Sequence, residues 1–385
     1  MRALNRLGSA LAAVALTAAT AAAFAGPASA ATARDSFPGA GHAVFVQTDN
    51  TAGNRVVAYH RSGDGKLTWV HSYSTDGLGG ALTGSVVDHL ASQGSLSYDP
   101  WHGLLYAVNA GSNTLSVFST RGDKLSLRQV ISSGGTFPVS VATHGDLVYA
   151  VNAENGGSVQ GYRVFLGRLF PIAGSNRPLG LDPTATPQFT NTPGQVAFSP
   201  SGSQLIVTTK MNGSDIDVFA VHVSGRLARS PVVNSVPGTV PFGITFDRAG
   251  HLVIADSGTN ALATYSLSAH GAVTLIDSAG NSQAATCWVA PARGFLFASN
   301  AGSGDVSRYS ASASGNLTLL GETATDAGTV DASASLGGHF LYVQTGGSGI
   351  VDEYRVGPAG SLSPIGSVTV AGAVGGEGIV AAGAR

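Results

Sequence analysis

The chain contains a single cysteine, Cys287, so no disulfide can form within it and packing must stabilise the fold. No residue near Cys287 in the sequence would lower its pKa, so we interpret it as a buried, inert thiol. Charge is also scarce, because only 11% of the 385 residues are charged and the net formal charge is −2. This charge is too small to steer nucleic acid or an anionic membrane surface to the protein, and we expect neither as a partner.

Local signatures of several enzyme classes are missing too. No histidine is followed by glutamate, which excludes the helical zinc-protease motif, and one cysteine excludes a thiolate zinc cluster. The sequence has no Gly-x-Ser-x-Gly elbow, no phosphate-binding loop and no twelve-residue calcium loop. We therefore predict no metal and no cofactor.

The first residues have the pattern of a secretion signal. Arg2 and Arg6 precede an uncharged run rich in Ala, Leu and Val at 7–24, and Ala-Ser-Ala at 28–30 is the small-residue pattern after which signal peptidases cleave. We predict that residues 1–30 are removed and that the mature protein is secreted, either extracellular or periplasmic. An uncleaved membrane anchor is the alternative, and no other apolar run is long enough to span a bilayer.

Seven aromatic residues recur along the rest of the chain at a nearly fixed interval. Four of the six intervals are 44 to 46 residues long, and the other two, of 59 and 57 residues, indicate the same unit with an insertion. This regularity predicts a repeat architecture. The seven residues are Tyr59, Phe118, Tyr162, Phe219, Tyr265, Tyr309 and Tyr354.

Each repeat unit can be divided into four short strands. In one unit we expect them at 195–199, 204–209, 216–221 and 227–233, with glycine recurring in the turn after the first strand and in the turn after the third. Four strands in about 45 residues form a β-propeller blade. A helical solenoid is the alternative, but no unit has a helix of ten or more residues with 3.6-residue periodicity.

The sequence therefore predicts an all-β, seven-bladed β-propeller. It would form one monomeric domain over residues 42–385, after a short linker at 31–41. The first blade lacks a first strand of its own, and residues 377–382 read as that missing strand. We predict that they pair beside residues 43–48 and close the ring, which removes two sheet edges that would otherwise invite aggregation.

Two passages carry a family resemblance, namely the sequence YAVNAGSNTLSV at 106–117 and FSPSG at 198–202. They resemble the Tyr-Val-Thr-Asn repeats and Ser-Pro-Asp-Gly turns of seven-bladed propellers, in particular the lactonase group that includes 6-phosphogluconolactonase and the fungal carboxymuconate cyclase. The resemblance covers residues 42–383 and implies hydrolysis or cyclisation of a lactone or sugar acid. Lactonase-type members often carry His, frequently after Arg, ahead of such a turn, whereas this chain has Gln195, which cannot shuttle a proton. No catalytic residue is transferred from the family.

Both insertions fall in connections between blades, at 75–93 and at 176–192. Such connections lie on the face of a propeller that also carries the loops between second and third strands. Extra length on one face is typical of a binding rim, although neutral loop variation is the alternative.

Charged or polar residues on this face that the repeat does not explain are the candidate site residues. His89 is the best proton carrier, because its ordinary pKa of about 6.5 lets it act near neutral pH. A solvated loop side chain is the alternative for each charged residue. The candidate catalytic residues are His89, Glu154 and Glu377, and the candidate substrate-binding residues are Asp49, Asp88, Arg177, Gln195 and Lys210.

Two classes of function remain open. The first is a secreted hydrolase or cyclase that acts on a small lactone, sugar acid or glycan, with a polysaccharide lyase as a minor variant. The second is a non-catalytic secreted propeller that binds a ligand, a glycan or a protein. Convergence of the candidate residues at one pocket would favour chemistry, and scattered groups on a flat rim would favour binding.

Overall fold

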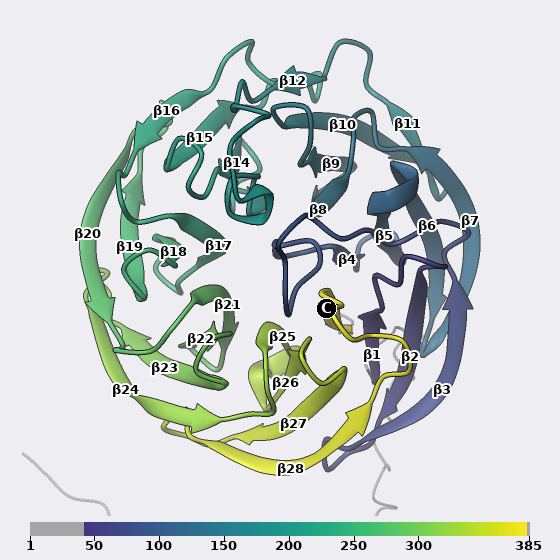
Figure 1. Ribbon diagram of the computed structural model, residues 1–385, viewed down its shortest axis with the longest axis vertical. Helices are drawn as coiled ribbons and strands as arrows, with labels where there is room; N and C mark the ends of the chain where they lie inside the picture. The colour runs from purple at the N-terminus through teal and green to yellow at the C-terminus, as the bar shows by residue number, and fades with distance from the viewer. Residues whose placement is uncertain (1–41, 383–385) are drawn as a thin grey trace, which may run out of the picture. The chain divides into compact units, whose positions relative to one another are not determined.

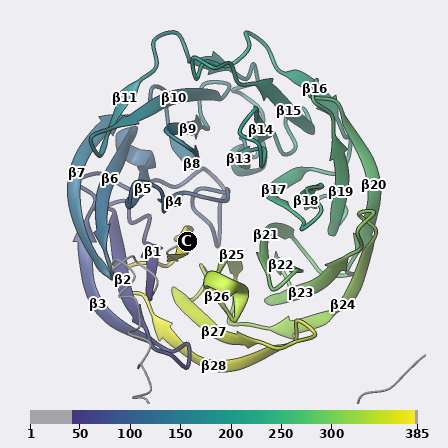
Figure 2. The ribbon, with the colours of Figure 1, turned by 180° about the vertical axis from the view of Figure 1, so that it is seen from behind.

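The computed structural model describes residues 42–382, which form seven antiparallel blades around a central channel (Figure 1). The prediction of an all-β, seven-bladed propeller is confirmed. The predicted secretion signal and linker lie outside the described residues. Figure 2 shows the ring from behind, with the fourth strands of the blades at its rim. Within the described range, no helix has the length and apolar character needed to cross a membrane.

The strands of each blade run in order from the channel to the rim. The first three blades are β29 (Ile379–Ala382), β1 (Ala43–Gln47), β2 (Arg55–Arg61) and β3 (Leu67–Ser74); β4 (Leu96–Asp99), β5 (Leu104–Asn109), β6 (Thr114–Arg121) and β7 (Lys124–Ser132); and β8 (Pro138–His144), β9 (Leu147–Asn152), β10 (Ser158–Phe165) and β11 (Arg168–Pro171), with β12 (Arg177–Pro178) also paired to β10. The fourth and fifth blades are β13 (Gln195–Phe198), β14 (Gln204–Thr208), β15 (Asp215–Ala220) and β16 (Val232–Ser235); and β17 (Pro241–Phe246), β18 (Leu252–Asp256), β19 (Ala261–Leu267) and β20 (Val273–Gly280). The last two blades are β21 (Thr286–Ala292), β22 (Phe295–Asn300), β23 (Asp305–Ala311) and β24 (Leu317–Ala324); and β25 (Thr329–Ala334), β26 (Phe340–Thr345), β27 (Ile350–Val356) and β28 (Leu362–Thr369). Three short 3-10 helices lie in the connections: η1 (Ala110–Ser112), η2 (Gln188–Thr190) and η3 (Leu336–Gly338).

The second strand of a blade is covered on both faces. Every residue of β5 and of β14 is buried, and both strands read as nearly continuous apolar runs. The fourth strand has one face exposed and alternates accordingly, as β7 does. The hydrophobic pattern therefore assigns each strand its depth in the blade.

The ring is closed by the end of the chain. Strand β29 pairs antiparallel with β1, with Ala43 opposite Ala382 and Val46 opposite Ile379. The predicted pairing of residues 377–382 beside 43–48 is confirmed. Blade 1 thus combines the last strand of the chain with the first three.

The seven recurring aromatic residues all lie on third strands, and all are buried. Several also join neighbouring blades, because their hydroxyl groups donate to carbonyl oxygens on the fourth strand of the preceding blade. Tyr162 donates to Ser132 at 2.6 Å, and Tyr354 donates to Ala324 at 2.9 Å. The repeat that the sequence displays is therefore a repeat of contacts between blades.

The fourth strand of blade 4 differs from the prediction. We expected it at 227–233, but β16 begins at Val232, and Leu227 makes only an isolated bridge to Val221. Residue 231 is proline, which has no N–H to give to a ladder. The carbonyl of Leu227 accepts a hydrogen bond from Arg177 of the second insertion instead.

Candidate functional site at the channel mouth

The first insertion turns inward and covers the channel. The connection between β3 and β4 reaches towards the centre of the ring in Figure 1. Its last residues contact blade 6, which is not a neighbour of blade 2: Trp288 Nε1 donates to the carbonyl of Ser92 at 2.6 Å, and Gln93 Nε2 donates to the carbonyl of Val289 at 2.9 Å. The insertion is therefore a plug across the channel rather than an outer rim.

The second insertion packs against the first. The backbone N–H of Thr83 donates to Gln188 Oε1 at 2.8 Å. Lys210, in the loop between β14 and β15, joins both insertions, because its Nζ donates to the carbonyls of Ala91 at 2.5 Å and Phe189 at 2.6 Å. The two segments that interrupt the repeat thus form one cover, joined directly by the bond from Thr83 to Gln188 and also by the buried Lys210.

Asp88 provides the negative charge that faces this lysine. Its carboxylate accepts the backbone N–H groups of Leu90 and Ser92, each at 2.8 Å, which fixes the turn of the insertion. Burial raises the pKa of Asp88 to about 7, opposed by these hydrogen bonds and by the charge of Lys210. Burial lowers the pKa of Lys210 to about 7, opposed by Asp88. Both groups therefore titrate near neutral pH.

Glu377 lies under the plug at the start of the closing strand. Its Oε1 accepts the backbone N–H of Gly94 at 2.8 Å, and its own N–H donates to Asp49 Oδ2 at 2.7 Å. Asp331 lies close by: its Oδ2 accepts the backbone N–H of Ile379 at 3.4 Å, and its charge helps to raise the pKa of Glu377.

All of these acids are buried, and burial raises their pKa values. The pKa of Asp49 rises to about 8, that of Asp331 to about 6, and that of Glu377 well above its ordinary value, with the nearby carboxylates adding to the effect on Glu377. Four acids and one lysine therefore form a closed, proton-holding cluster, which we call the channel cluster: Asp49, Asp88, Asp331, Glu377 and Lys210.

His89 lies at the edge of the channel cluster and is only partly buried. Its backbone N–H donates to the carbonyl of Gly375 at 2.8 Å, and its ring packs so closely on Gly375 that a Cβ there would lie 2.2 Å from Nε2. Its Nδ1 is buried without a hydrogen-bond partner among the described residues. Burial lowers the pKa of His89, so the imidazole is neutral at pH 7.

The other three predicted site residues lie elsewhere. Glu154 accepts a hydrogen bond from Gln188 at 3.0 Å beside a pocket of about 190 Å³. The guanidinium of Arg177 donates to four backbone carbonyls, including Ala228 at 2.7 Å, and fastens the second insertion. Gln195 Oε1 accepts the N–H of Ile244 at 2.5 Å and links two inner strands.

Asp331 was not among the predicted residues. It is a buried acid inside the inner strand β25. Among residues 42–382, no three His, Cys, Asp or Glu side chains are placed to hold a metal ion. Cys287 is a buried free thiol whose pKa burial raises to about 12.

The channel cluster predicts that the fold is more stable in mild acid than in mild base. An acid whose pKa is higher in the folded state holds extra protons when folded, so the free energy of unfolding falls as pH rises, here between about pH 4 and pH 8. Lys210 has the opposite shift and adds stability only above about pH 7. We expect the melting temperature to fall by roughly 2–5 °C from pH 5 to pH 8.

Asp49→Asn should flatten this decline, because burial raises the pKa of Asp49 further than those of Asp88 and Asp331. Asp64→Asn is the control, since Asp64 is exposed and its lowered pKa leaves it ionised throughout this range. Scanning calorimetry at several pH values measures both. An equally steep decline in Asp49→Asn would contradict the assignment.

Comparisons with known proteins find relatives by structure only. No protein-family model and no curated protein sequence match the chain. The periplasmic gluconolactonase of Pseudomonas aeruginosa is 16% identical with a TM-score of 0.69, over 88% of this chain and 98% of that one. A Bacteroides uniformis protein provisionally named 6-phosphogluconolactonase is 19% identical with a TM-score of 0.70, over 86% and 97%. Virginiamycin B lyase of Staphylococcus aureus is 13% identical with a TM-score of 0.52, over 75% and 89%. At these identities the likeness shows the fold alone.

Proposed function

We propose that this protein hydrolyses a small lactone, such as the cyclic ester of a sugar acid, at the mouth of its channel. The observation that carries the proposal is the position of His89. It is a half-buried imidazole whose buried Nδ1 has no partner among the described residues, and it directly follows Asp88 in the sequence. Burial lowers the pKa of His89. Groups with shifted pKa values, gathered in one place, are typical of acid–base chemistry.

The reaction needs only water and the substrate. The imidazole of His89 takes a proton from a water molecule, whose oxygen attacks the carbonyl carbon of the lactone. The bond between that carbon and the ring oxygen then breaks, and the ring oxygen receives the proton from the imidazolium. The product is the open-chain hydroxy acid.

The channel cluster limits which other residues take part. Lys210 already donates to two carbonyls, and Glu377 is covered by Gly94, so neither contacts a substrate while the first insertion is in place. We infer that His89 acts with the plug closed. Asp88 holds the turn that positions His89, which follows it directly in the sequence.

The structural comparisons support a lactone substrate by analogy. The Pseudomonas protein is named a gluconolactonase, and the Bacteroides protein carries a related name. The lyase among the matches is named for virginiamycin B, so it shows that a similar fold can carry a lyase reaction and gives no support to a glycan substrate.

A non-catalytic binding propeller is the second candidate. It is favoured by the burial of Asp49, Glu377 and Lys210, whose polar atoms are occupied by the protein itself. A cluster of this kind can have a purely structural role, which is to hold the two insertions over the channel. The ligand, glycan or protein partner would then bind to the outer surface of that cover.

Turnover of lactones separates the two candidates. The purified protein should hydrolyse at least one member of a panel of aldonolactones and aliphatic lactones, and His89→Ala should lower kcat/KM by about a hundredfold. The rate of the parent should fall in acid, because a protonated imidazole cannot accept a proton, and the lowered pKa of His89 moves this fall to lower pH. His71→Ala, at an exposed histidine on β3, is the control. No turnover, or full activity in His89→Ala, would leave the binding function.

We also propose that the protein works after export as a monomer, without its first 30 residues. The arginines followed by an apolar run and a small-residue site support this proposal. Mass spectrometry of the protein from an expressing host should find an N-terminus at residue 31. A mature protein that keeps residues 1–30 would contradict it.

A further inference from the structure

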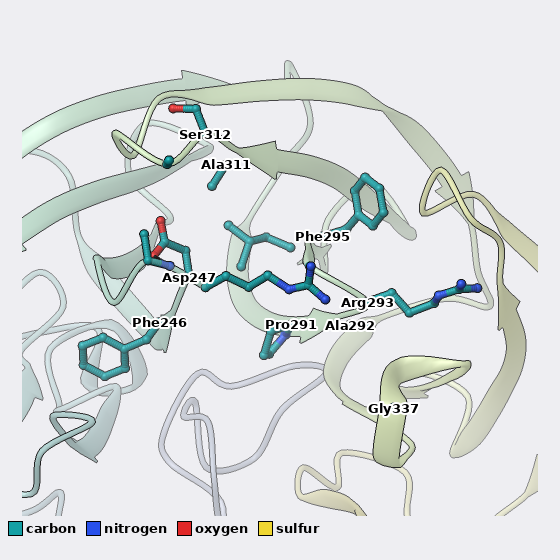
Figure 3. Close-up of a pocket in the computed structure, with 14 residues that line it drawn as sticks. Phe246, Asp247, Pro291, Ala292, Arg293, Phe295, Ala311, Ser312 and Gly337 are labelled. Atoms are coloured by element: carbon teal, nitrogen blue, oxygen red, sulfur yellow. Dashed lines mark hydrogen bonds between the residues drawn. The ribbon is translucent and has the colours of Figure 1, made fainter. Parts of the chain in front are cut away.

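A second pocket, of about 690 Å³, opens on the opposite face of the propeller. It lies between blades 5 and 6, under the turn that joins β17 to β18, the turn that joins β21 to β22, and the turn that follows β23. Figure 3 shows the side chains that line it. The volume is within the range of small-molecule sites. Nothing in the proposed function uses this pocket.

Arg248 is the lining residue with unused binding capacity. Its side chain makes no hydrogen bond or ion pair with any residue from 42 to 382. The guanidinium packs across Gly294, where a Cβ would lie 2.8 Å from both Cζ and Nε. Gly294 also has a φ of +85°, so glycine fits this position for two reasons. The guanidinium of Arg248 thus has no partner among the described residues and lies directly over Gly294.

No acid among the described lining residues forms an ion pair with Arg248. Asp247 is the one carboxylate in the lining, and it is occupied elsewhere: its Oδ2 lies 2.7 Å from His251 Nδ1, and its Oδ1 accepts the N–H groups of Ala249 and His251. Arg293 adds a second positive charge and uses Nη1 to donate to Val356. The pocket is therefore cationic.

Apart from Ser312, the rest of the lining is apolar or glycine. Phe295, Pro291 and Leu296 form the apolar wall. The ring of Phe246 points away from the cavity (Figure 3) and packs against the core between blades 4 and 5. We propose that this pocket binds a small organic anion, whose carboxylate pairs with the guanidinium of Arg248 and whose apolar body lies against Phe295. Arginine presents paired N–H groups that match a carboxylate, and the apolar walls favour an attached ring or alkyl chain.

Calorimetric titration with benzoate tests the proposal. Benzoate should bind saturably, and more tightly than acetate, which has no apolar body, or benzyl alcohol, which has no charge. Arg248→Ala should weaken benzoate binding by about tenfold or more. Arg248→Lys should keep part of the affinity, because a lysine keeps the charge but not the paired donors. Arg229→Ala is the matched control, at an exposed arginine outside the pocket.

Two results would overturn the assignment. One is benzoate binding that is absent or no tighter than that of benzyl alcohol. The other is binding that Arg248→Ala leaves unchanged while His89→Ala abolishes it, which would place benzoate at the channel mouth. Circular dichroism of Arg248→Ala confirms that any loss is not unfolding. The outcome is independent of lactone turnover, so failure of one proposal does not decide the other.

Discussion

A chain that ends at residue 373 is expected to lose the folded propeller rather than one strand of it. The deletion of residues 374–385 removes β29, which forms the inner edge of blade 1 and pairs with four residues of β1. It also removes Glu377, whose main chain and side chain contact Asp49, Gly94 and Ser95. The ring then opens at a fully buried strand, and every remaining blade loses the closure that fixes its position.

We expect the truncated protein to be insoluble or to melt at least about 10 °C below the parent, because the loss exceeds that of any single core side chain. Expression yield, circular dichroism and thermal melting measure it. A chain that ends at residue 382 keeps the whole of β29 and is the control. A protein without residues 374–385 that melts like the parent would show that blade 1 is stable without β29.

Replacing Lys210 by methionine is expected to cost about 3 kcal/mol of unfolding free energy. Methionine fills a similar volume, but the carbonyls of Ala91 and Phe189 lose their donor and Asp88 loses its counter-charge. Asp88 can take up a proton, since its pKa is about 7, and this limits the loss. The two insertions should also separate, so that hydrogen exchange becomes faster in residues 75–93 and 176–192.

A double-mutant cycle tests whether Asp88 and Lys210 act as a pair. Asp88→Asn removes the charge and keeps one acceptor oxygen, so the double variant should be less destabilised than the sum of the single variants. Lys124→Met, at an exposed lysine at the start of β7, is the control and should leave stability nearly unchanged. Additive effects of the two single variants would refute the pairing.

The fold could be predicted because every blade carries the same short sequence signals. One signal is the buried aromatic residue of each third strand, such as Tyr162 or Tyr354. Another is the glycine in the turn after that strand, such as Gly225 or Gly271, which adopts a positive φ. These signals are local and occur in every unit, so a single misread unit does not change the conclusion. The closing strand was predictable for the same reason, because the first blade visibly lacked one.

The path of the insertions could not be predicted from such patterns. The hydrogen bonds from Trp288 to Ser92 and from Gln93 to Val289 join residues 196 positions apart, and no periodic signal announces them. The sequence placed the insertions on one face but could not tell a rim from a plug. Arg177 shows the same limit. The sequence shows only a positive charge on an insertion, whereas in the structure the guanidinium donates hydrogen bonds to backbone carbonyls.

The channel cluster was predicted in part. Asp49 and Lys210 stood out because other blades have small residues at comparable positions, Glu377 because it opens the closing strand, and Asp88 because it lies on the first insertion. The structure brings these four residues together. Their complete burial was not foreseen, because it depends on where the first insertion folds. Sequence contrast therefore finds unusual residues, while the depth at which they lie is decided by the tertiary structure.

The pairing of β29 with β1 has a consequence for the order in which this protein matures. Strand β1 is apolar and buried, but its partner is the last strand to leave the ribosome. Until then one long edge of blade 1 has no neighbour, and the intermediate can pair with other chains. Contacts between chain ends are also slow to form, because the loop to be closed is the whole domain. The time between the synthesis of β1 and that of β29 is therefore when a chaperone, or a delay in folding, would best protect the unpaired edge of blade 1.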